Sequence, residues 1–176
     1  VVRLASQKGY MQFWSLYNRP PILEFQDYLL ERRDSLIPVD ERNYKGAYYT
    51  PLAVVDKAYD YLVQTLGKNW QKDYFVWDMC CGVGNLESKH GNHRNLFMST
   101  LDADDLSIIE ASRAYTASFK FQYDYLNDDI DEDGNFNYNL TNKMPKELRD
   151  ILQGNSRKKL LVLINPPYVE ATSGNT

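Results

Sequence analysis

The sequence is poor in cysteine, glycine, proline and long hydrophobic runs. Its 176 residues include only 2 cysteines, 9 glycines and 7 prolines, which excludes fibrous and disulfide-rich proteins. The two cysteines, Cys80 and Cys81, are adjacent, so they can neither join distant segments nor supply a four-ligand zinc site. The longest aliphatic run, residues 160–164, is far shorter than the ~20 residues that cross a membrane. We find no signal peptide and expect a soluble, cytoplasmic protein that does not bind a membrane.

Composition indicates one packed domain and leaves the kind of substrate open. Hydrophobic residues make up 43% of the chain and aromatic residues 14%, which is enough to bury a core. The net charge of −4 looks unfavourable for a nucleic-acid-binding protein, but five acidic residues fall within residues 128–133 alone. A DNA or RNA substrate is neither supported nor excluded, because a local basic surface matters more than the total charge.

Helical and strand-like segments alternate along the chain. Residues 1–44 are expected to form a helical lead-in arm, and residues 45–176 the main domain. Thr50 followed by Pro51 predicts the start of a helix, with Thr50 as its N-cap. The complete pattern has helices over residues 51–66, 104–117 and 145–152 and after Gly84, and strands over residues 74–77, 96–101, 119–123 and 160–164.

This alternation predicts an α/β fold with a doubly wound, mainly parallel sheet and flanking helices. Residues 160–164 are continuously apolar, as in a strand buried on both faces, so we expect that strand near the sheet centre. Residues 127–144 are rich in Asp and Asn and are expected to form a solvated excursion after the third strand.

A glycine-containing loop, residues 78–84, follows the first predicted strand directly. Gly82 would let the backbone turn sharply, and Gly84 would let it approach a ligand that a side chain would block. The spacing suggests a nucleotide-type cofactor, although such a loop taken alone is most often only a turn. It matches neither the dinucleotide fingerprint nor a phosphate-binding loop.

Two aspartates end the next two predicted strands. Asp102 lies where a doubly wound fold places the acid that binds ribose hydroxyls, 24 residues after Asp78. The alternative is a helix cap, a role that we assign to Asp104 or Asp105. Asp124 could accept a hydrogen bond from an adenine amino group, and it could equally well form a turn.

The fourth predicted strand ends in Asn165, Pro166, Pro167 and Tyr168. The two prolines stiffen the backbone, so the Asn165 side-chain oxygen and the Pro166 carbonyl could act as fixed acceptors for an amino group. Hydrogen bonds that draw such an amine toward tetrahedral geometry make its nitrogen a better nucleophile. Tyr168 would offer an aromatic face to a base lifted out of its stack. The alternative is a strand that merely ends at a Pro-Pro turn.

Together, these segments resemble the adenine-specific DNA amino-methyltransferases that use S-adenosylmethionine, in the group whose cofactor motifs precede the catalytic motif. Five motifs occur in the family's order between residues 45 and 168, with Met79 where the family usually has proline. The resemblance implies a Rossmann-like methyltransferase fold, of which we expect only the first half here. It assigns to the cofactor Tyr48, Thr50, Pro51, Asp78, Cys81, Gly82, Gly84, Asp102, Ala103, Asp124 and Tyr125, and to catalysis Asn165, Pro166, Pro167 and Tyr168.

The resemblance implies transfer of a methyl group from S-adenosylmethionine to the exocyclic amine of adenine in flipped-out DNA, without a metal. It also implies a fused or associated target-recognition or nuclease module, as in restriction-modification systems. Because about half of the catalytic domain is expected to be missing, we expect that these 176 residues alone do not methylate DNA. The alternatives are a methyltransferase for ribosomal RNA or protein glutamine, and a non-catalytic subunit of the same fold.

Two other patterns are weaker indications of a metal site. Residues 129–134 match the opening of a calcium loop, but its final position is Leu140 instead of a bidentate Glu, so we expect a solvated acidic turn. His90 and His93 lack a matching set of further ligands, and we interpret them as part of a polar loop.

Overall fold

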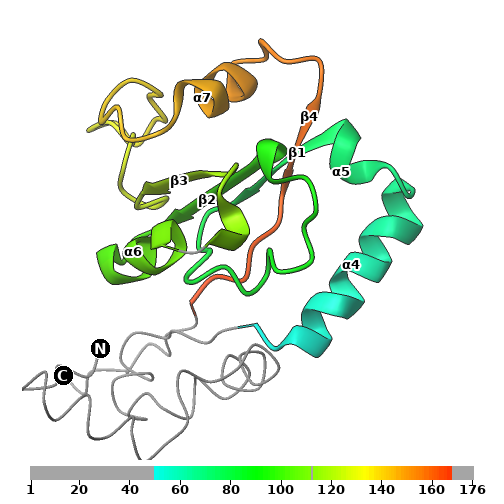
Figure 1. The fold of residues 1–176 in the computed structure, drawn as a ribbon. Coiled ribbons are helices and arrows are strands. Elements are labelled where there is room, and N and C mark those ends of the chain that lie inside the picture. The colour runs from blue at the N-terminus through cyan, green and yellow to red at the C-terminus, as the bar shows by residue number, and fades with distance from the viewer. Residues whose placement is uncertain (1–49, 112, 168–176) are drawn as a thin grey trace, which may run out of the picture. The chain divides into compact units, whose positions relative to one another are not determined.

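The computed structural model describes residues 50–111 and 113–167. The expected lead-in arm, Tyr48 and Tyr168 lie outside these residues. The described chain contains a four-stranded sheet whose strands are β1 (Tyr74–Asp78), β2 (Leu96–Thr100), β3 (Phe119–Gln122) and β4 (Lys159–Val162). All neighbouring strands are parallel, in the order β3-β2-β1-β4 (Figure 1). The predicted α/β fold with a parallel sheet is confirmed, and each predicted strand lies within two residues of its predicted bounds.

The first and last helices of the described chain lie where the sequence predicts them. The predicted helices over residues 51–66 and 145–152 are confirmed as α4 (Leu52–Leu66) and α7 (Lys146–Leu152). The predicted helix over residues 104–117 is shorter, since α6 ends at residue 111. The remaining helical segments are α5 (Trp70–Asp73), α6 (Ala103–Ala111) and the two 3-10 turns η2 (His93–Asn95) and η3 (Arg113–Tyr115).

The prediction of a helix after Gly84 is wrong. Residues 82–89 form successive turns, and η2 comes only at residue 93. Gly82 and Gly84 have φ angles of 53° and 89°, which a right-handed helix does not allow. The chain therefore passes from β1 to β2 through a loop of successive turns and not through a helix.

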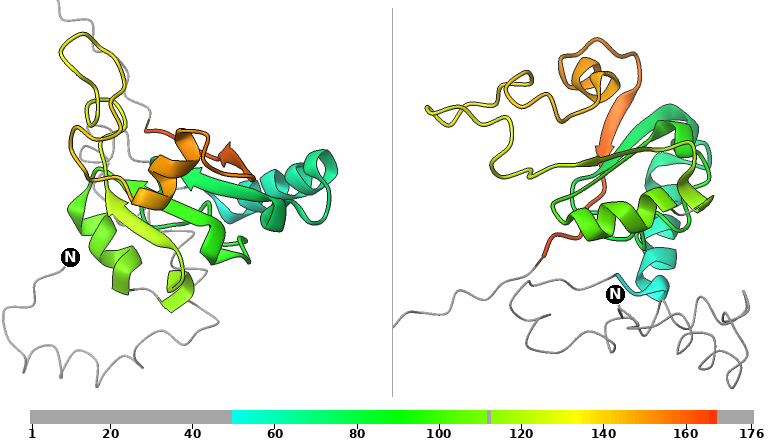
Figure 2. Two further views of the ribbon diagram at one scale, coloured as in Figure 1. Left: turned by 90° about the horizontal axis from the view of Figure 1, so that it is seen from above. Right: turned by 60° about the vertical axis from the view of Figure 1, so that its left-hand side comes forward.

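Helices cover both faces of the sheet, which explains why its strands are apolar on both sides. Along β1, Val76 packs into a core with α4 and α6, while Trp77 packs into a second core with α7. Along β2, Met98 and Phe97 divide between the same two cores. Figures 1 and 2 show α7 on the opposite side of the sheet from α6. The predicted doubly wound arrangement is present in the described part of the chain.

The position predicted for the fourth strand is wrong. Within the described residues, β4 pairs only with β1 and is an edge strand, and Val162 is 45% exposed. Leu160 and Leu161 nevertheless pack against the cores on opposite faces. The apolar run thus reflects two covered faces, and two covered faces do not require a second neighbouring strand.

The strand order creates a crevice between β1 and β4. From β1 the chain moves outward through β2 to β3, and then returns to the other side of β1 as β4. In open α/β sheets, ligands bind outside the carboxyl ends of the strands where the order reverses in this way. Asp78 ends β1 and Asn165 follows β4, so both lie at this point.

Candidate functional site

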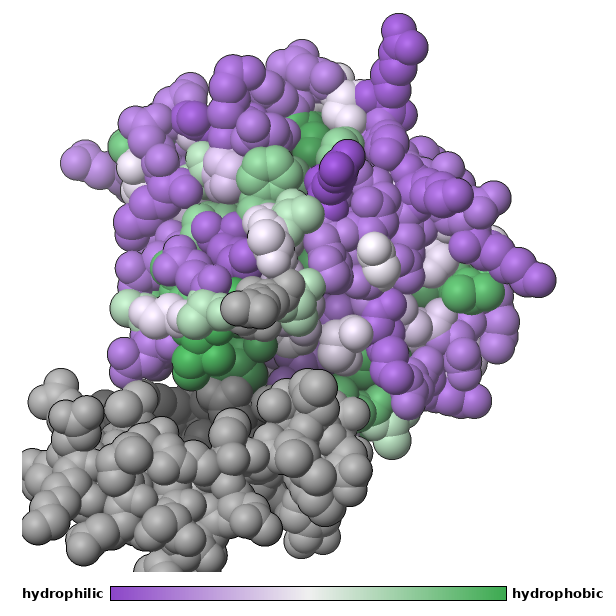
Figure 3. Space-filling model, in the orientation of Figure 1, coloured by the Kyte–Doolittle hydropathy of each residue, from purple (hydrophilic) through white to green (hydrophobic). Residues whose placement is uncertain are grey.

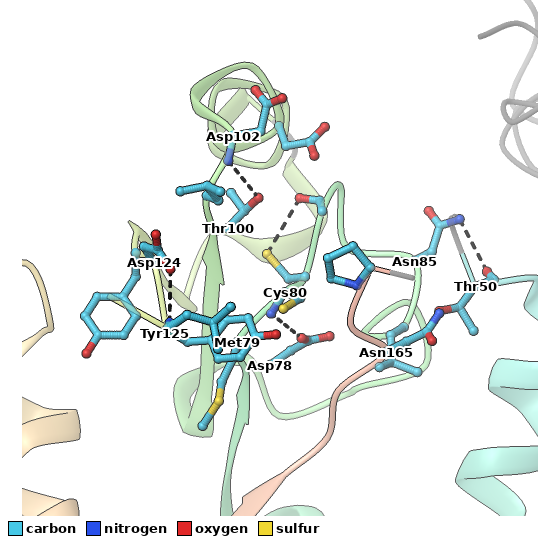
Figure 4. A pocket seen from close by; sticks show the side chains of 18 residues that line it. Thr50, Asp78, Met79, Cys80, Asn85, Thr100, Asp102, Asp124, Tyr125 and Asn165 are labelled. Atoms are coloured by element: carbon cyan, nitrogen blue, oxygen red, sulfur yellow. Dashed lines mark hydrogen bonds between the residues drawn. The ribbon is translucent and has the colours of Figure 1, made fainter. Parts of the chain in front are cut away.

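A pocket of about 580 Å³ opens at the carboxyl ends of the strands. Its walls come from the loop after β1, the ends of β2 and β3, and the segment after β4. In Figure 4, Thr50, Asn85 and Asn165 lie on one side of the loop, and Asp124 and Tyr125 lie on the other. The fold therefore brings into one pocket residues that are as distant in the sequence as Thr50 and Asn165, which are 115 positions apart.

The start of the loop after β1 is fixed by two hydrogen bonds. The Cys80 N–H donates a hydrogen bond of 2.8 Å to Asp78 Oδ1, and the Cys81 N–H donates one of 2.9 Å to the Ser99 carbonyl of β2. Asp78 is only 1% exposed. Gly82 lines the pocket with a positive φ angle, which agrees with the predicted sharp turn.

The second glycine has a different role from the predicted one. Gly84 does not line the pocket, and its backbone carbonyl accepts a 2.6 Å hydrogen bond from the Tyr115 hydroxyl. A Cβ on Gly84 would lie 2.8 Å from the Tyr115 ring and 3.0 Å from the Met98 methyl group. The missing side chain makes room for an internal tyrosine instead of a ligand.

Asp102 lines the pocket and also caps α6. Its Oδ1 accepts a 2.8 Å hydrogen bond from the Asp104 N–H, and its carbonyl accepts one from Leu106. The prediction that Asp104 or Asp105 caps this helix is wrong, because Asp102 itself does so. Capping fixes one carboxylate oxygen and thereby sets the direction of the whole group. Asp105 also lines the pocket, whereas Ala103, the first residue of α6, does not.

Asp124 and Tyr125 form the opposite wall. Asp124 accepts hydrogen bonds from the Asn127 side chain at 2.7 Å and from the Leu126 N–H at 3.0 Å. The Asn127 hydrogen bond is the main cause that lowers the pKa of Asp124 below its usual value. Asp124 therefore forms the turn that the sequence offered as an alternative, and it still lines the pocket as an anion.

Asn165 and Thr50 form the third wall. The Asn165 Nδ2 donates a 2.9 Å hydrogen bond to Thr50 Oγ1, and the Thr50 carbonyl accepts a weaker one of 3.5 Å from Asn85. The predicted N-cap role of Thr50 is wrong, since no side chain caps α4 and Pro51 occupies the N-cap position. Thr50 instead orients the Asn165 amide.

Charge in the pocket has one sign. Four carboxyl groups line it, and no Lys, Arg or His does so among the described residues. They belong to Asp78, Asp102, Asp105 and Asp124. Such a lining attracts a cationic ligand and repels the phosphates of nucleoside phosphates and dinucleotides. This selectivity could not be predicted from the net charge of the chain.

Two apolar side chains at the pocket were missed from the sequence. The face shown in Figure 3 is mostly hydrophilic, with hydrophobic surface only in separate zones. Leu101 and Leu126, however, are 65% and 67% exposed and line the pocket. Exposed leucines beside a cavity offer contact area for a flat apolar ring. The sequence placed Leu101 at the end of a predicted strand and Leu126 directly after Asp124 and Tyr125, and neither position indicated exposure at a pocket.

A buried polar cluster behind the loop was also missed. Glu87 is completely buried, and neither oxygen of its carboxyl group has a hydrogen-bond partner among the described residues. His90 was predicted to lie in a polar loop, but it is only 2% exposed and packs edge-on against Tyr59 and Trp70. Both residues lie in a polar stretch of sequence, and only the packing of α4 and α5 over the loop buries them.

The acidic excursion is only partly solvated. Asp129 is completely buried and accepts hydrogen bonds from the Thr141 N–H and hydroxyl, at 2.8 and 2.9 Å, and from the Tyr123 hydroxyl. The expected solvated turn is therefore wrong at Asp129, which ties the excursion to the sheet. The expectation holds at Asp131, which closes an exposed turn by accepting from the Asp133 and Asn135 N–H groups.

Not every predicted site residue reaches the pocket. Thr50, Asp78, Cys81, Gly82, Asp102, Asp124, Tyr125, Asn165 and Pro167 line it, whereas Pro51, Gly84, Ala103 and Pro166 do not. In residues 50–111 and 113–167 no group of three His, Cys, Asp or Glu side chains could hold a metal ion. No helix in that part of the chain is long and apolar enough to span a membrane.

The fold is that of an α/β protein with a Rossmann-like parallel sheet, and its pocket lies at the carboxyl ends of the strands. No protein-family model matches the sequence, and no curated protein sequence matches it significantly. The function is therefore argued from the pocket and from the motifs.

Proposed function

We propose that this protein is a methyltransferase that transfers a methyl group from S-adenosylmethionine to the exocyclic amine of adenine in DNA. The observation that carries the proposal is a pocket in which Asp102, Asp124 and Asn165 meet and to which no described residue contributes a basic side chain. Each of these residues follows a different strand of the sheet.

The residues of the pocket fit S-adenosylmethionine. This cofactor carries a sulfonium and an ammonium group, so carboxylate walls favour it over a nucleoside phosphate. Asp102 would accept hydrogen bonds from the ribose hydroxyls, since it ends the second strand as the ribose-binding acid does in doubly wound folds. Asp124 would accept from the adenine amino group, with Leu101 and Leu126 beside the ring. When bound, the cofactor supplies an activated methyl group.

Asn165 would hold the amine that receives the methyl group. Because its Nδ2 donates to Thr50, the amide is held in one orientation, and its oxygen is the acceptor that it offers to a substrate. Pro166 and Pro167 stiffen the backbone that follows. An amine held in this way is poised for in-line transfer, and positioning of this kind lowers the barrier without a strong base.

DNA as the acceptor is supported by the resemblance of the five motifs. Tyr168, which follows Pro167 directly, would stack on the flipped-out base. A target-recognition or nuclease module would supply sequence specificity. Ribosomal RNA and protein glutamine offer similar NH2 groups as methyl acceptors. A non-catalytic subunit would methylate none of these acceptors. Incubation with labelled S-adenosylmethionine and either duplex DNA, RNA or protein, in the presence of any such module, distinguishes these cases by which acceptor gains label.

Cofactor binding is tested by calorimetric titration of S-adenosylmethionine into the protein and into two variants. Asp102→Asn removes the carboxylate charge but keeps an oxygen for the Asp104 N–H, so α6 stays capped. Asp131→Asn is the matched control, because Asp131 likewise accepts from the N–H two residues later but lies outside the pocket. We expect at least tenfold weaker binding, about 1.4 kcal/mol, only for Asp102→Asn.

Three results contradict the cofactor assignment. One is no binding by the folded parent protein, as judged by circular dichroism. The others are equal binding by the parent and Asp102→Asn, or an equal loss in both variants, which would trace the effect to turns instead of the pocket.

A further inference from the structure

The acidic excursion, residues 127–144, does not line the pocket but is hydrogen-bonded to its wall. It is the loop between β3 and α7 in Figure 1. Tyr123, at the end of β3, lines the pocket, and its hydroxyl donates a 3.1 Å hydrogen bond to Asp129 Oδ2. Asp129 Oδ1 accepts from the Thr141 N–H at 2.8 Å and from the Thr141 hydroxyl at 2.9 Å. One carboxylate therefore ties both limbs of the excursion to the end of β3.

The preceding residue, Asp128, holds the turn that carries Asp124. Asp128 Oδ2 accepts a 2.8 Å hydrogen bond from the Asp124 N–H, and the Asp128 N–H donates one of 2.7 Å to the Asp124 carbonyl. Lys143 Nζ, from the returning limb, lies 2.8 and 2.9 Å from the two Asp128 oxygens. Both backbone polar groups of Asp124 are thus bonded to Asp128, so the position of Asp124 in the pocket depends on where Asp128 is held.

Asp129 combines two features that are costly for a surface loop. Its φ angle is 59°, in the left-handed region that residues other than glycine rarely adopt. Its side chain is 0% exposed, and the groups that donate to it are a neutral amide and two neutral hydroxyls. A strained backbone and a buried carboxylate persist only where the surrounding contacts hold them. A loop that had only to be solvated would need neither, which indicates that Asp129 supports something else.

We propose that Asp129 is a positioning residue for the wall of the pocket that contains Asp124. It does not line the pocket itself, so it acts through its neighbours. It holds Tyr123 through the hydroxyl, and it fixes the end of the turn in which Asp128 holds Asp124. The excursion is then a support of the binding site, although none of its residues faces the ligand.

This support has a consequence for the ligand. In the proposed function Asp124 accepts a hydrogen bond from the adenine amino group, so a displaced Asp124 would lose selectivity for adenine. The effect on adenine selectivity rests on the proposed function. The positioning of the wall does not, because it follows from the hydrogen bonds among the described residues alone.

The first test is amide hydrogen exchange, resolved by NMR at pH 7, in Asp129→Gly, Asp129→Asn and Asn142→Gly. Glycine adopts a positive φ without strain, so Asp129→Gly removes the side chain and leaves the backbone conformation. Asp129→Asn keeps an oxygen for Thr141 and offers an NH2 group to the Tyr123 oxygen. Asn142 is the matched control, because it belongs to the same excursion, has a positive φ of 54° and accepts from Arg149 away from the pocket.

We expect the Asp124 and Asp128 amides to exchange at least tenfold faster in Asp129→Gly than in the parent, and within threefold of the parent in the other two variants. Unchanged exchange in Asp129→Gly overturns the proposal. Equal acceleration in Asn142→Gly does so too, since it would trace the effect to the stability of the whole protein. A loss in Asp129→Asn as large as in Asp129→Gly also overturns it, because the amide keeps the contacts.

The second test is calorimetric titration of S-adenosylhomocysteine and of S-inosylhomocysteine, in which a carbonyl oxygen replaces the adenine amino group. We expect the parent and Asn142→Gly to prefer the adenosine form at least tenfold, and Asp129→Gly to lose at least threefold of that preference. A general loss of stability would weaken both ligands equally. An unchanged preference in Asp129→Gly therefore overturns the effect on adenine selectivity.

The failure of this inference and the failure of the proposed function can be told apart. If the parent binds neither ligand but Asp129→Gly accelerates exchange of the Asp124 amide, the proposed function alone is refuted. If the parent binds with the expected preference but exchange is unchanged in Asp129→Gly, the positioning role of Asp129 alone is refuted.

Discussion

The side-chain nitrogen of Asn165 donates a 2.9 Å hydrogen bond to the hydroxyl oxygen of Thr50, which precedes α4 by two residues. The two residues are 115 positions apart, and each belongs to a different one of the motifs that carry the resemblance. The contact fixes the amide and closes one wall of the pocket. It also explains why Thr50 is buried although it does not cap the helix.

Replacement of Thr50 tests this hydrogen bond. Thr50→Val keeps the shape of the side chain and removes the hydroxyl, so we expect a loss of about 1 kcal/mol in the free energy of unfolding. Thr50→Ser keeps the hydroxyl and should restore most of the hydrogen bond. Urea denaturation of the three proteins measures the difference. Equal stability of the Val and Ser variants would show that the hydroxyl contributes nothing.

Replacement of Gly84 by Ala tests the close packing of Tyr115. Gly84 and Gly154 have φ angles of 89° and 82°, so Ala is strained at both, by about 1–3 kcal/mol. Only at Gly84 does the new Cβ also meet a ring, at 2.8 Å, whereas nothing lies within 4 Å at Gly154. We expect Gly84→Ala to lose about 1–3 kcal/mol more than Gly154→Ala. Equal losses in urea denaturation would contradict the packing argument.

Because of His90, the free energy of unfolding should depend on pH. Burial lowers the pKa of His90 to about 4 from an ordinary value of 6.5. Between these two pH values His90 is mostly protonated in the unfolded chain and mostly neutral in the folded protein. Stability should therefore fall as pH drops from 6.5 to 4, by up to about 3 kcal/mol from this residue. His90→Phe keeps the ring contacts with Tyr59 and Trp70. Denaturation of both proteins across this range should show a shallower fall in the variant, and parallel curves would refute the assignment.

Cys80 offers a chemical probe of the pocket. It lines the pocket, and burial, followed by the Asp78 charge, raises the pKa of its thiol to about 11. At pH 8.5 about half of free cysteine is thiolate, against well under about 1% for Cys80. Alkylation by iodoacetamide should be far slower than that of free cysteine, and slower again with S-adenosylmethionine. Cys80→Ser reports the background from Cys81. A rate equal to that of free cysteine would contradict the raised pKa and the half-buried position of Cys80.

Much of the fold could be predicted from the sequence because apolar runs and turn residues act locally. The segments that became β1 to β4 are short and mostly apolar, and α4 and α7 each begin directly after a proline. The edge position of β4 could not be predicted, since burial of both faces leaves the same pattern as a central position. The turns of residues 82–89 depend on two glycines whose φ angles only the structure reveals.

The candidate site divides in the same way. Asp102, Asp124 and Asn165 could be placed at one pocket, because the ends of parallel strands meet at one edge of the sheet. Glu87 could not be identified, since a glutamate in a polar loop gives no sign that α4 and η3 bury it. Leu101 and Leu126 were missed for the opposite reason, because a leucine at or just after a predicted strand is expected to be buried.

The central claim is that the acid-lined pocket takes a cationic nucleoside, and one comparison tests it directly. S-adenosylmethionine and ATP share adenosine and differ in the charge of the group attached to it. Calorimetric titration of each into the protein at the same ionic strength should show binding of S-adenosylmethionine and at least hundredfold weaker binding of ATP, about 2.7 kcal/mol. Equal binding of the two, or binding of ATP alone, would contradict the account.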